Sequence, residues 1–337
     1  MNILLTSAGR RTYLVNYFIN ALSDRGKVYA SNSEFSPALN TADGFVITPL
    51  IYDKNYIPFL LQFVKEKNIS VIIPLFDIDL PVLAKARDLF KDIGVAVVVS
   101  DYEVTQICND KWNTYNFLID NGFDTPKTYI DYKKAKGDLK KRVLDFPLII
   151  KPRWGMGSIG IYKAENHIEL EVFYKKVKKE IEESYLKFES EAQIDQAVLI
   201  QECIIGQEYG LDIFNDLNSK HIKTFVKKKT AMRSGETDSA VTENHKELQV
   251  IGARLSEKLG HIGNLDSDWF IPDNKIYVLE INCRFGGGYP FTHLAGANLL
   301  KVLLDLLMNN RYEPKDLDIQ YEIEMMKDIQ PIKLNSR

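Results

Sequence analysis

The segment from residue 265 to 288, LDSDWFIPDNKIYVLEINCRFGGG, constrains the fold most because it predicts one particular β-hairpin. Two strand-like runs flank turn-forming residues at 272–274. If residues 273–275 form a three-residue loop, Asp268 lies opposite Glu280, and the two-residue period of a strand places Asn282 on the same face. Two carboxylates and an amide oxygen then converge. Such hard oxygen donors suit Mg²⁺, which is usually completed by substrate phosphates.

The residues that follow this hairpin extend the predicted site. Arg284 continues the alternation, so an extended strand places a fixed positive charge beside the metal ligands. The glycines at 286–288 allow the backbone to approach a ligand closely. The alternative is an ordinary exposed hairpin with scattered acids, and the segment alone leaves both interpretations open.

The first hundred residues predict a parallel sheet. Strand-like runs at 2–6, 27–33, 70–76 and 94–100 alternate with helical segments, and ligands of such sheets collect at the carboxyl ends of the strands. The turn after the first strand, TSAGRR, has one glycine and lacks GxGxxG, which argues against a nicotinamide cofactor there, and no GxxxxGK[ST] phosphate loop is present. Charged residues at the strand ends either shape an acceptor pocket or are solvated loop charges and helix caps: Arg10, Arg11, Glu34, Asp77 and Asp79.

A second region begins where this alternation stops, near residue 109. A helix starts at Lys111, and a later run, FPLIIKP, ends at Lys151 and Pro152 before the glycine-rich RWGMGSIG. A β-hairpin with a glycine-rich tip would turn backbone N–H groups toward anionic oxygens, and Lys151 would supply charge for a phosphate. A plain mobile loop is the alternative. Residues 164–193 predict one largely solvated helix.

Two strands around Gly206 form the next pair of candidate sites. Residues 202–204 are expected to present backbone groups to an adenine edge, and Glu208 to accept from ribose hydroxyls or to form a surface salt bridge. Further on, HIKTFVKKKT alternates, so Lys227, Lys229 and, if the strand continues, Arg233 share a face and are candidates to hold a substrate carboxylate. Residues 292–308 predict a helix near the end of the chain.

Composition limits the remaining classes. The 337 residues are enough for two or three domains, and 43 Lys and Arg against 46 Asp and Glu give a net charge of -3, which does not indicate nucleic acid or an anionic membrane as a partner. Three widely separated cysteines predict neither a disulfide framework nor a zinc pair. With no signal peptide or apolar run long enough for a bilayer, the expected compartment is the cytoplasm.

In this order, the motifs NDK, IIKP with its glycine-rich hairpin, QECIIGQE, the Asp268 strand and LEINCRFGGG resemble those of the ATP-grasp superfamily. The resemblance covers nearly the whole chain. Members of the superfamily include carbamoyl phosphate synthase large subunits and carboxylate–amine ligases. The resemblance implies an α/β (α+β) fold: a parallel-sheet domain before the ATP-grasp fold at 1–108, a small lobe with the glycine-rich hairpin at 109–200, and a large lobe with the metal site at 201–337.

The resemblance also implies roles for individual residues. Lys111 and Lys151 contact ATP phosphates, the loop containing Gly155, Gly157 and Ser158 folds over them, and Arg284 steadies the intermediate. The remaining family positions are the adenine-lining residues, the ribose acid and the ligands of Mg²⁺ or Mn²⁺: Glu202, Cys203, Ile204, Glu208, Asp268, Glu280 and Asn282. An aspartate at 268 differs from the Glu or Gln of the carbamoyl phosphate and biotin branches and favours peptide-type ligases.

The function expected from this resemblance is an ATP-dependent ligase that joins a small-molecule carboxylate and an amine through an acylphosphate. Catalysis is expected from Arg284 and Lys151, with Lys229 and Arg233 holding substrate. Two alternatives are a bicarbonate-activating enzyme similar to half of carbamoyl phosphate synthase and an ATP-binding subunit without chemistry. The sequence leaves the oligomeric state open, with a homodimer as one possibility because many relatives in the family dimerise, and it identifies neither substrate.

Overall fold

The computed structural model describes residues 1–155, 157 and 159–333, and its N-terminal part contains the predicted parallel sheet. The sheet has the order β3-β2-β1-β4-β5. Its strands are β1 (Asn2–Thr6), β2 (Val28–Asn32), β3 (Gly44–Ile47), β4 (Ile69–Pro74) and β5 (Ala96–Val97). The flanking helices are α1 (Thr12–Leu22), α2 (Pro37–Thr41), α3 (Tyr56–Glu66) and α4 (Asp79–Lys91). Strand β3 was not predicted; it is an edge strand with exposed Phe45 and Ile47, so it lacks a buried apolar run.

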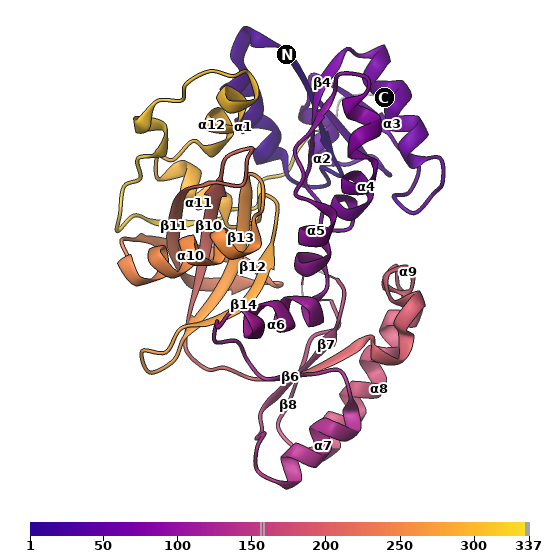
Figure 1. The fold of residues 1–337 in the computed structure, drawn as a ribbon, viewed down its shortest axis with the longest axis vertical. Coiled ribbons are helices and arrows are strands. Elements are labelled where there is room, and N and C mark those ends of the chain that lie inside the picture. The colour runs from indigo at the N-terminus through magenta and orange to yellow at the C-terminus, as the bar shows by residue number, and fades with distance from the viewer. Residues whose placement is uncertain (156, 158, 334–337) are drawn as a thin grey trace.

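A four-stranded antiparallel sheet forms the small lobe, shown at the bottom of Figure 1. Its order is β6-β9-β7-β8, from β6 (Thr128–Tyr129), β7 (Leu148–Pro152), β8 (Tyr162–Ala164) and β9 (Val198–Glu202). The predicted hairpin around the glycine-rich segment is confirmed, because Leu148 pairs with Ala164 and Ile150 with Tyr162. Helices α5 (Tyr102–Asn109) and α6 (Lys111–Asp120) precede it, and α7 (Tyr132–Lys140) lies within it.

The prediction of a single helix over residues 164–193 is wrong. It is divided into α8 (His167–Glu183), α9 (Leu186–Ser190) and a 3-10 turn (Glu191–Gln196). The division occurs because Ser184 adopts an extended backbone conformation at the end of α8.

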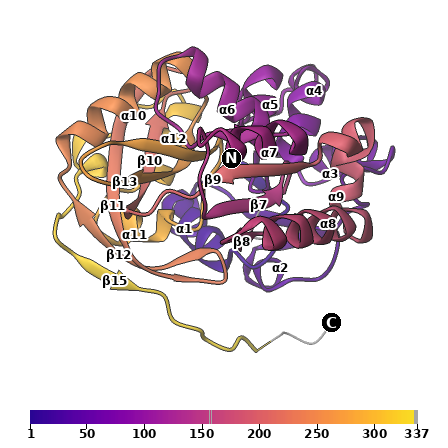
Figure 2. The ribbon, with the colours of Figure 1, turned by 90° about the horizontal axis from the view of Figure 1, so that it is seen from below.

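The large lobe contains a six-stranded antiparallel sheet of order β14-β13-β10-β11-β12-β15. Its strands are β10 (Gln207–Asn215), β11 (His221–Arg233), β12 (Glu236–Glu243), β13 (Asn264–Ile271), β14 (Tyr277–Asn282) and β15 (Glu324–Met326). Helix α10 (Lys246–Leu259) packs on β10 and β11. The helix predicted over 292–308 is two helices, α11 (Tyr289–Leu294) and α12 (Leu299–Leu307), and the tail adds β15 beside β12 (Figure 2).

The N-terminal domain and the large lobe share a hydrophobic core. Helix α12, drawn in yellow in Figure 1, lies beside α1 near the start of the chain. Phe18 of α1, Phe214 of β10 and Leu303 of α12 belong to one buried cluster. This shared packing fixes the carboxyl ends of the parallel strands against the large sheet.

A buried ion pair connects the start of α6 to the base of the glycine-rich loop. Asp110 caps α6 and accepts hydrogen bonds from Arg153 Nε and Nη2, both at 2.7 Å. Arg153 is 5% exposed and its guanidinium lies 4.4 Å from the centre of the Trp154 ring. The loop therefore begins from a rigid, fully paired base.

We predict that Arg153→Met destabilises the fold by about 3 to 5 kcal/mol, because it leaves the buried carboxylate of Asp110 unpaired. Urea unfolding followed by tryptophan fluorescence measures the change. Arg87→Met is the matched control, because Arg87 pairs with Asp101 at the surface and should contribute less than about 1 kcal/mol. Equal losses in the two variants would contradict the role of the Arg153 pair.

Candidate active site

A cleft of about 610 Å³ lies where the three parts of the chain meet. Most of the predicted site residues line it: Lys111, Lys151, Gly155, Gly157, Glu202, Cys203, Ile204, Glu208, Lys229, Asp268, Glu280, Asn282 and Arg284. Ser158 lies outside the described residues. Residues distant in sequence thus share one cavity, as a two-lobed site requires.

Arg233 does not lie in this cleft. The pairing of β11 with β12 shifts between Lys229 and Ala231 and again before Met232, so the alternation that would have kept Arg233 on the face of Lys229 is interrupted. The Arg233 side chain is 47% exposed and forms an ion pair with Asp238 at 2.5 Å. The prediction from strand parity is therefore wrong beyond Lys229.

The hairpin of β13 and β14 has the predicted register at the site. Asp268 pairs with Glu280, and Asp266 pairs with Asn282. The predicted three-residue loop is wrong: the fully buried Trp269 pairs with Val278 and Phe270 pairs with Tyr277, one residue out of the expected register. The register shift between Asp268 and Trp269 compensates for this difference and brings Asp268 opposite Glu280 as predicted.

Lys229 connects two of the predicted acids. Its Nζ donates to Asp268 Oδ1 at 2.6 Å and to Glu208 Oε1 at 2.7 Å. Burial raises the pKa of Asp268, although the neighbouring ammonium of Lys229 opposes that change. The lysine thus neutralises the acids rather than presenting a free charge to a substrate.

The acid and amide face has the donor chemistry of a magnesium site, although it is not a dense carboxylate cluster. Asp268, Glu280 and Asn282 offer two carboxylates and an amide oxygen, the hard donors that Mg²⁺ takes together with phosphate oxygens. Within the described ranges, no group of three or more His, Cys, Asp or Glu side chains is placed to hold a metal. Such a face would need a ligand's oxygens to complete it.

Two lysines approach this face from the small lobe. Lys111 Nζ lies 3.9 Å from Glu280 Oε1 and donates to the carbonyl of Gly155 at 2.5 Å. Lys151 Nζ donates to Gln201 Oε1 at 2.8 Å. Burial lowers the pKa of Lys151 to about 8. Burial alone would raise the pKa of Glu280, but Lys111, Lys151 and Arg284, together with a hydrogen bond to Asn282, outweigh it and hold the pKa below its usual value.

Arg284 is held by two carboxylates that sequence reasoning did not assign to it. Its Nε and Nη2 donate to Asp77 Oδ2 at 3.1 and 2.9 Å, and its Nη1 donates to Asp266 Oδ2 at 3.1 Å. Burial raises the pKa of Asp266 to about 6. Gly286 is required here, because a Cβ atom on it would lie 1.9 Å from Asp266 Oδ2.

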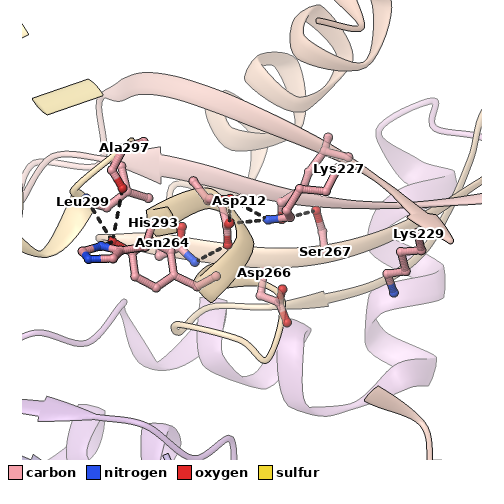
Figure 3. Close-up of polar contacts among 12 residues, drawn as sticks. Asp212, Lys227, Lys229, Asn264, Asp266, Ser267, His293, Ala297 and Leu299 are labelled. Atoms are coloured by element: carbon pink, nitrogen blue, oxygen red, sulfur yellow. Dashed lines mark hydrogen bonds and ion pairs between the residues drawn. The ribbon is translucent and has the colours of Figure 1, made fainter. Parts of the chain in front are cut away.

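A second buried charge pair supports the floor of the cleft. Asp212 accepts from Lys227, from Thr292 Oγ1 at 2.5 Å and from Asn264 Nδ2 at 3.0 Å (Figure 3). Lys227 was a predicted substrate-binding residue, and it lines the cleft but is 2% exposed. An acid within the apolar run YGLDIF was the signal in the sequence for this partner.

Comparison with known protein families assigns most of the chain to two family models. Residues 108–288 match the model of the ATP-grasp domain, and residues 3–98 match the PylC-like N-terminal domain. The chain belongs to the ATP-grasp family. This assignment confirms the resemblance and the α/β fold predicted from the motifs.

Curated relatives of this ATP-grasp chain include two carbamoyl phosphate synthases. The chain is 23% identical over 273 residues to the enzyme of Methanobrevibacter smithii, covering 77% of this chain and 70% of the relative. It is 18% identical over 257 residues to the arginine-specific large chain of Bacillus subtilis, covering 74% of this chain but only 23% of that protein's length.

Solved structures with the same fold include ATP-grasp carboxylases and ligases. The biotin carboxylase domain dimer of Hydrogenobacter thermophilus 2-oxoglutarate carboxylase, in complex with MgADP and bicarbonate, has a TM-score of 0.74 at 16% identity. The match covers 96% of this chain and 73% of that one. The L-amino acid ligase of Bacillus licheniformis has a TM-score of 0.68 at 19% identity, covering 95% and 77%. These neighbours share the fold of the chain, and the family confirms the predicted ATP-grasp enzyme class.

The charged residues predicted at the ends of the parallel strands do not all lie in the cleft. Arg11 lines the cleft and Asp77 binds Arg284, whereas Arg10 and Glu34 are exposed and do not line it. Asp79 is fully buried and accepts hydrogen bonds from the hydroxyls of Thr6, Ser7 and Tyr56.

No described helix has the length and apolarity needed to cross a bilayer.

We predict that affinity for ADP falls as the pH rises above about 8, because Lys151 loses its charge over that range while a bound phosphate favours the charged form. Calorimetric titration with ADP at pH 7 and pH 10 measures the loss, which should approach about tenfold per unit above the pKa. Lys151→Arg keeps its charge and should bind ADP with a flatter dependence. A wild-type affinity unchanged between the two pH values would exclude this role.

Proposed function

We propose that this protein is an ATP-dependent carboxylate–amine ligase that forms an amide through an acylphosphate and releases ADP and phosphate. The observation that carries the proposal is the placement of Arg284 beside the face of Asp268, Glu280 and Asn282, with Lys111 and Lys151 approaching from the other lobe. This arrangement suits phosphoryl transfer, in which a protein mainly positions reactants and neutralises charge.

The cleft supplies groups for each part of a nucleotide. The link between the lobes at Glu202, Cys203 and Ile204 would line the adenine, and Glu208 would accept from the ribose. Lys111 and Lys151 would bind the phosphates. Gly155 and Gly157, with φ of 114° and 66°, allow the loop to turn over those phosphates in conformations that other residues rarely adopt.

Asp268, Glu280 and Asn282 would hold the metal, Mg²⁺ or Mn²⁺. The ion would neutralise negative charge on the transferred group. Lys229 forms salt bridges with Asp268 and Glu208 and so reduces the repulsion between these closely spaced acids. Lys229 would therefore act on the acids of the site rather than on a substrate carboxylate.

The chemistry divides into two displacements. The substrate carboxylate oxygen attacks the γ-phosphorus and ADP leaves; the amine nitrogen then attacks the acyl carbon, loses a proton and expels phosphate. Lys151 would stabilise charge on the phosphoryl oxygens in the first step. Arg284, held in place by Asp77 and Asp266, would stabilise the oxyanion in the second.

A second candidate is activation of bicarbonate to carboxyphosphate. It is favoured by the names of two curated relatives, which are carbamoyl phosphate synthases, and by the bicarbonate in the complex of the Hydrogenobacter thermophilus domain. Incorporation of labelled bicarbonate into product, with phosphate release that depends on bicarbonate, would favour this candidate over the ligase.

A screen of amino acids, other carboxylic acids and amines for substrate-dependent phosphate release tests the proposal directly, with mass spectrometry of the product. The expected result is one acid and one amine that together release phosphate and form an amide. ATP binding without phosphate release in any combination would instead indicate a nucleotide-binding subunit.

We predict that Arg284→Met lowers product formation by about 10² to 10³-fold, the usual loss when one oxyanion donor is removed. Affinity for ATP should change less than about threefold, since the phosphate-binding lysines remain. Arg284→Lys keeps the charge but cannot bridge both carboxylates, and it should also be impaired. Arg254→Met, on the exposed face of α10, is the control for a lost arginine. Full turnover by Arg284→Met would refute the role.

A further inference from the structure

Arg11 differs from every other cation in the cleft. It directly precedes α1, whose Leu14 N–H donates to the Arg11 carbonyl at 3.0 Å, and its half-buried side chain lines the cavity. Among the described residues, its guanidinium makes no ion pair or hydrogen bond with another side chain or carbonyl. A rigid loop thus presents a positive charge to the cleft without a protein partner.

The other cations that line the cleft all have partners. These pairs are Lys111 with Gly155, Lys151 with Gln201, Lys227 with Asp212, Lys229 with Asp268 and Arg284 with Asp77. A partly buried guanidinium without a partner loses hydration and gains nothing in return. A bound ligand with a negative charge would compensate for this lost hydration.

Arg284 is the cation that acts on Arg11, and Arg11, Arg284 and Glu236 line the same cleft. Burial and then the charge of Arg284 lower the pKa of Arg11, while Asp77 and Glu236 act in the opposite direction. The cations that act on Glu280, by contrast, are Lys111, Lys151 and Arg284. Arg284 therefore acts both on Arg11 and on the proposed metal-binding face.

We propose that Arg11 binds a carboxylate of the small-molecule substrate, and that this substrate is an amino acid. A planar guanidinium pairs with a carboxylate through two parallel hydrogen bonds. Glu236 lines the same end of the cleft, and its carboxylate, 67% exposed, contacts only Lys327 of the tail at 3.2 Å among its described ion-pair partners. A surface pair of this kind exchanges readily, which leaves Glu236 to meet an ammonium group.

This inference rests on the proposed ligase function, because it names the substrate group that the same cleft takes. It adds a specificity that the function itself does not require. An acid activated at Arg284 needs only one carboxylate, whereas an Arg11 and Glu236 subsite selects substrates that carry both charges of an amino acid.

The test uses the full chain, with Arg10→Met as the matched control because Arg10 is the neighbouring arginine and is exposed outside the cleft. Thermal unfolding is measured with MgADP and each of the common amino acids, and again with the corresponding amino acid amides. At least one amino acid should raise the Tm of the wild type and of Arg10→Met, its amide should not, and Arg11→Met should lose the effect. MgADP alone should stabilise all three proteins equally.

The kinetic measurement separates this inference from the proposed function. For the amino acid that supports phosphate release, Arg11→Met should raise KM at least about tenfold, equivalent to one lost charged pair. Stabilisation by an amino acid without any phosphate release would overturn the ligase function and retain the Arg11 subsite. The subsite is overturned if no amino acid stabilises the wild type, if amides act equally well, or if Arg11→Met behaves as Arg10→Met does.

Discussion

The guanidinium of Arg284 unites the site because its position depends on all of the surrounding architecture. It follows β14, but its hydrogen bonds go to Asp266 on β13 and to Asp77 after β4 of the N-terminal domain. A charge buried among unpaired groups would be unstable, and three hydrogen bonds to two carboxylates both stabilise and orient it. The arginine therefore stays aligned only while the shared core of α1 and α12 holds the N-terminal domain in place.

The cleft contains many charges, and nearly all of them are neutralised before any ligand arrives. Lys229 bridges Glu208 and Asp268, and Lys111 lies beside Glu280. Preformed pairs of this kind reduce the repulsion among neighbouring carboxylates. Ligand binding in such a cavity is an exchange of ionic partners, in which little new charge has to be desolvated. Groups that are already fixed also need little reorganisation, and therefore little energy, when charge develops on a reactant.

Local patterns in the sequence predicted the parts of the site that depend on local geometry. Turn-forming residues predicted the hairpin, and the two-residue period placed Asn282 on the face of Glu280, whereas the pair of Asp268 with Glu280 also depends on a register shift that compensates for a different turn. The contact of Arg284 with Asp77 spans 207 residues, and no periodicity links positions so distant. Arg233 was misplaced because a register shift inside β11 cannot be read from alternation. The divided helices at 164–193 and 292–308 likewise end through backbone changes that apolar spacing does not encode.

The C-terminal strand β15 also determines how copies of this protein can associate. Without it, the eight-residue strand β12 would form an open edge of the large sheet, a template for a strand from another molecule. On the opposite edge, Val278 of β14 donates to the Asp124 carbonyl at 2.9 Å, and α5 and α6 lie against that strand. The remaining edge is three residues long and followed by Lys327 and Asp328. Continuous intermolecular pairing through the edges of the large sheet is thereby disfavoured.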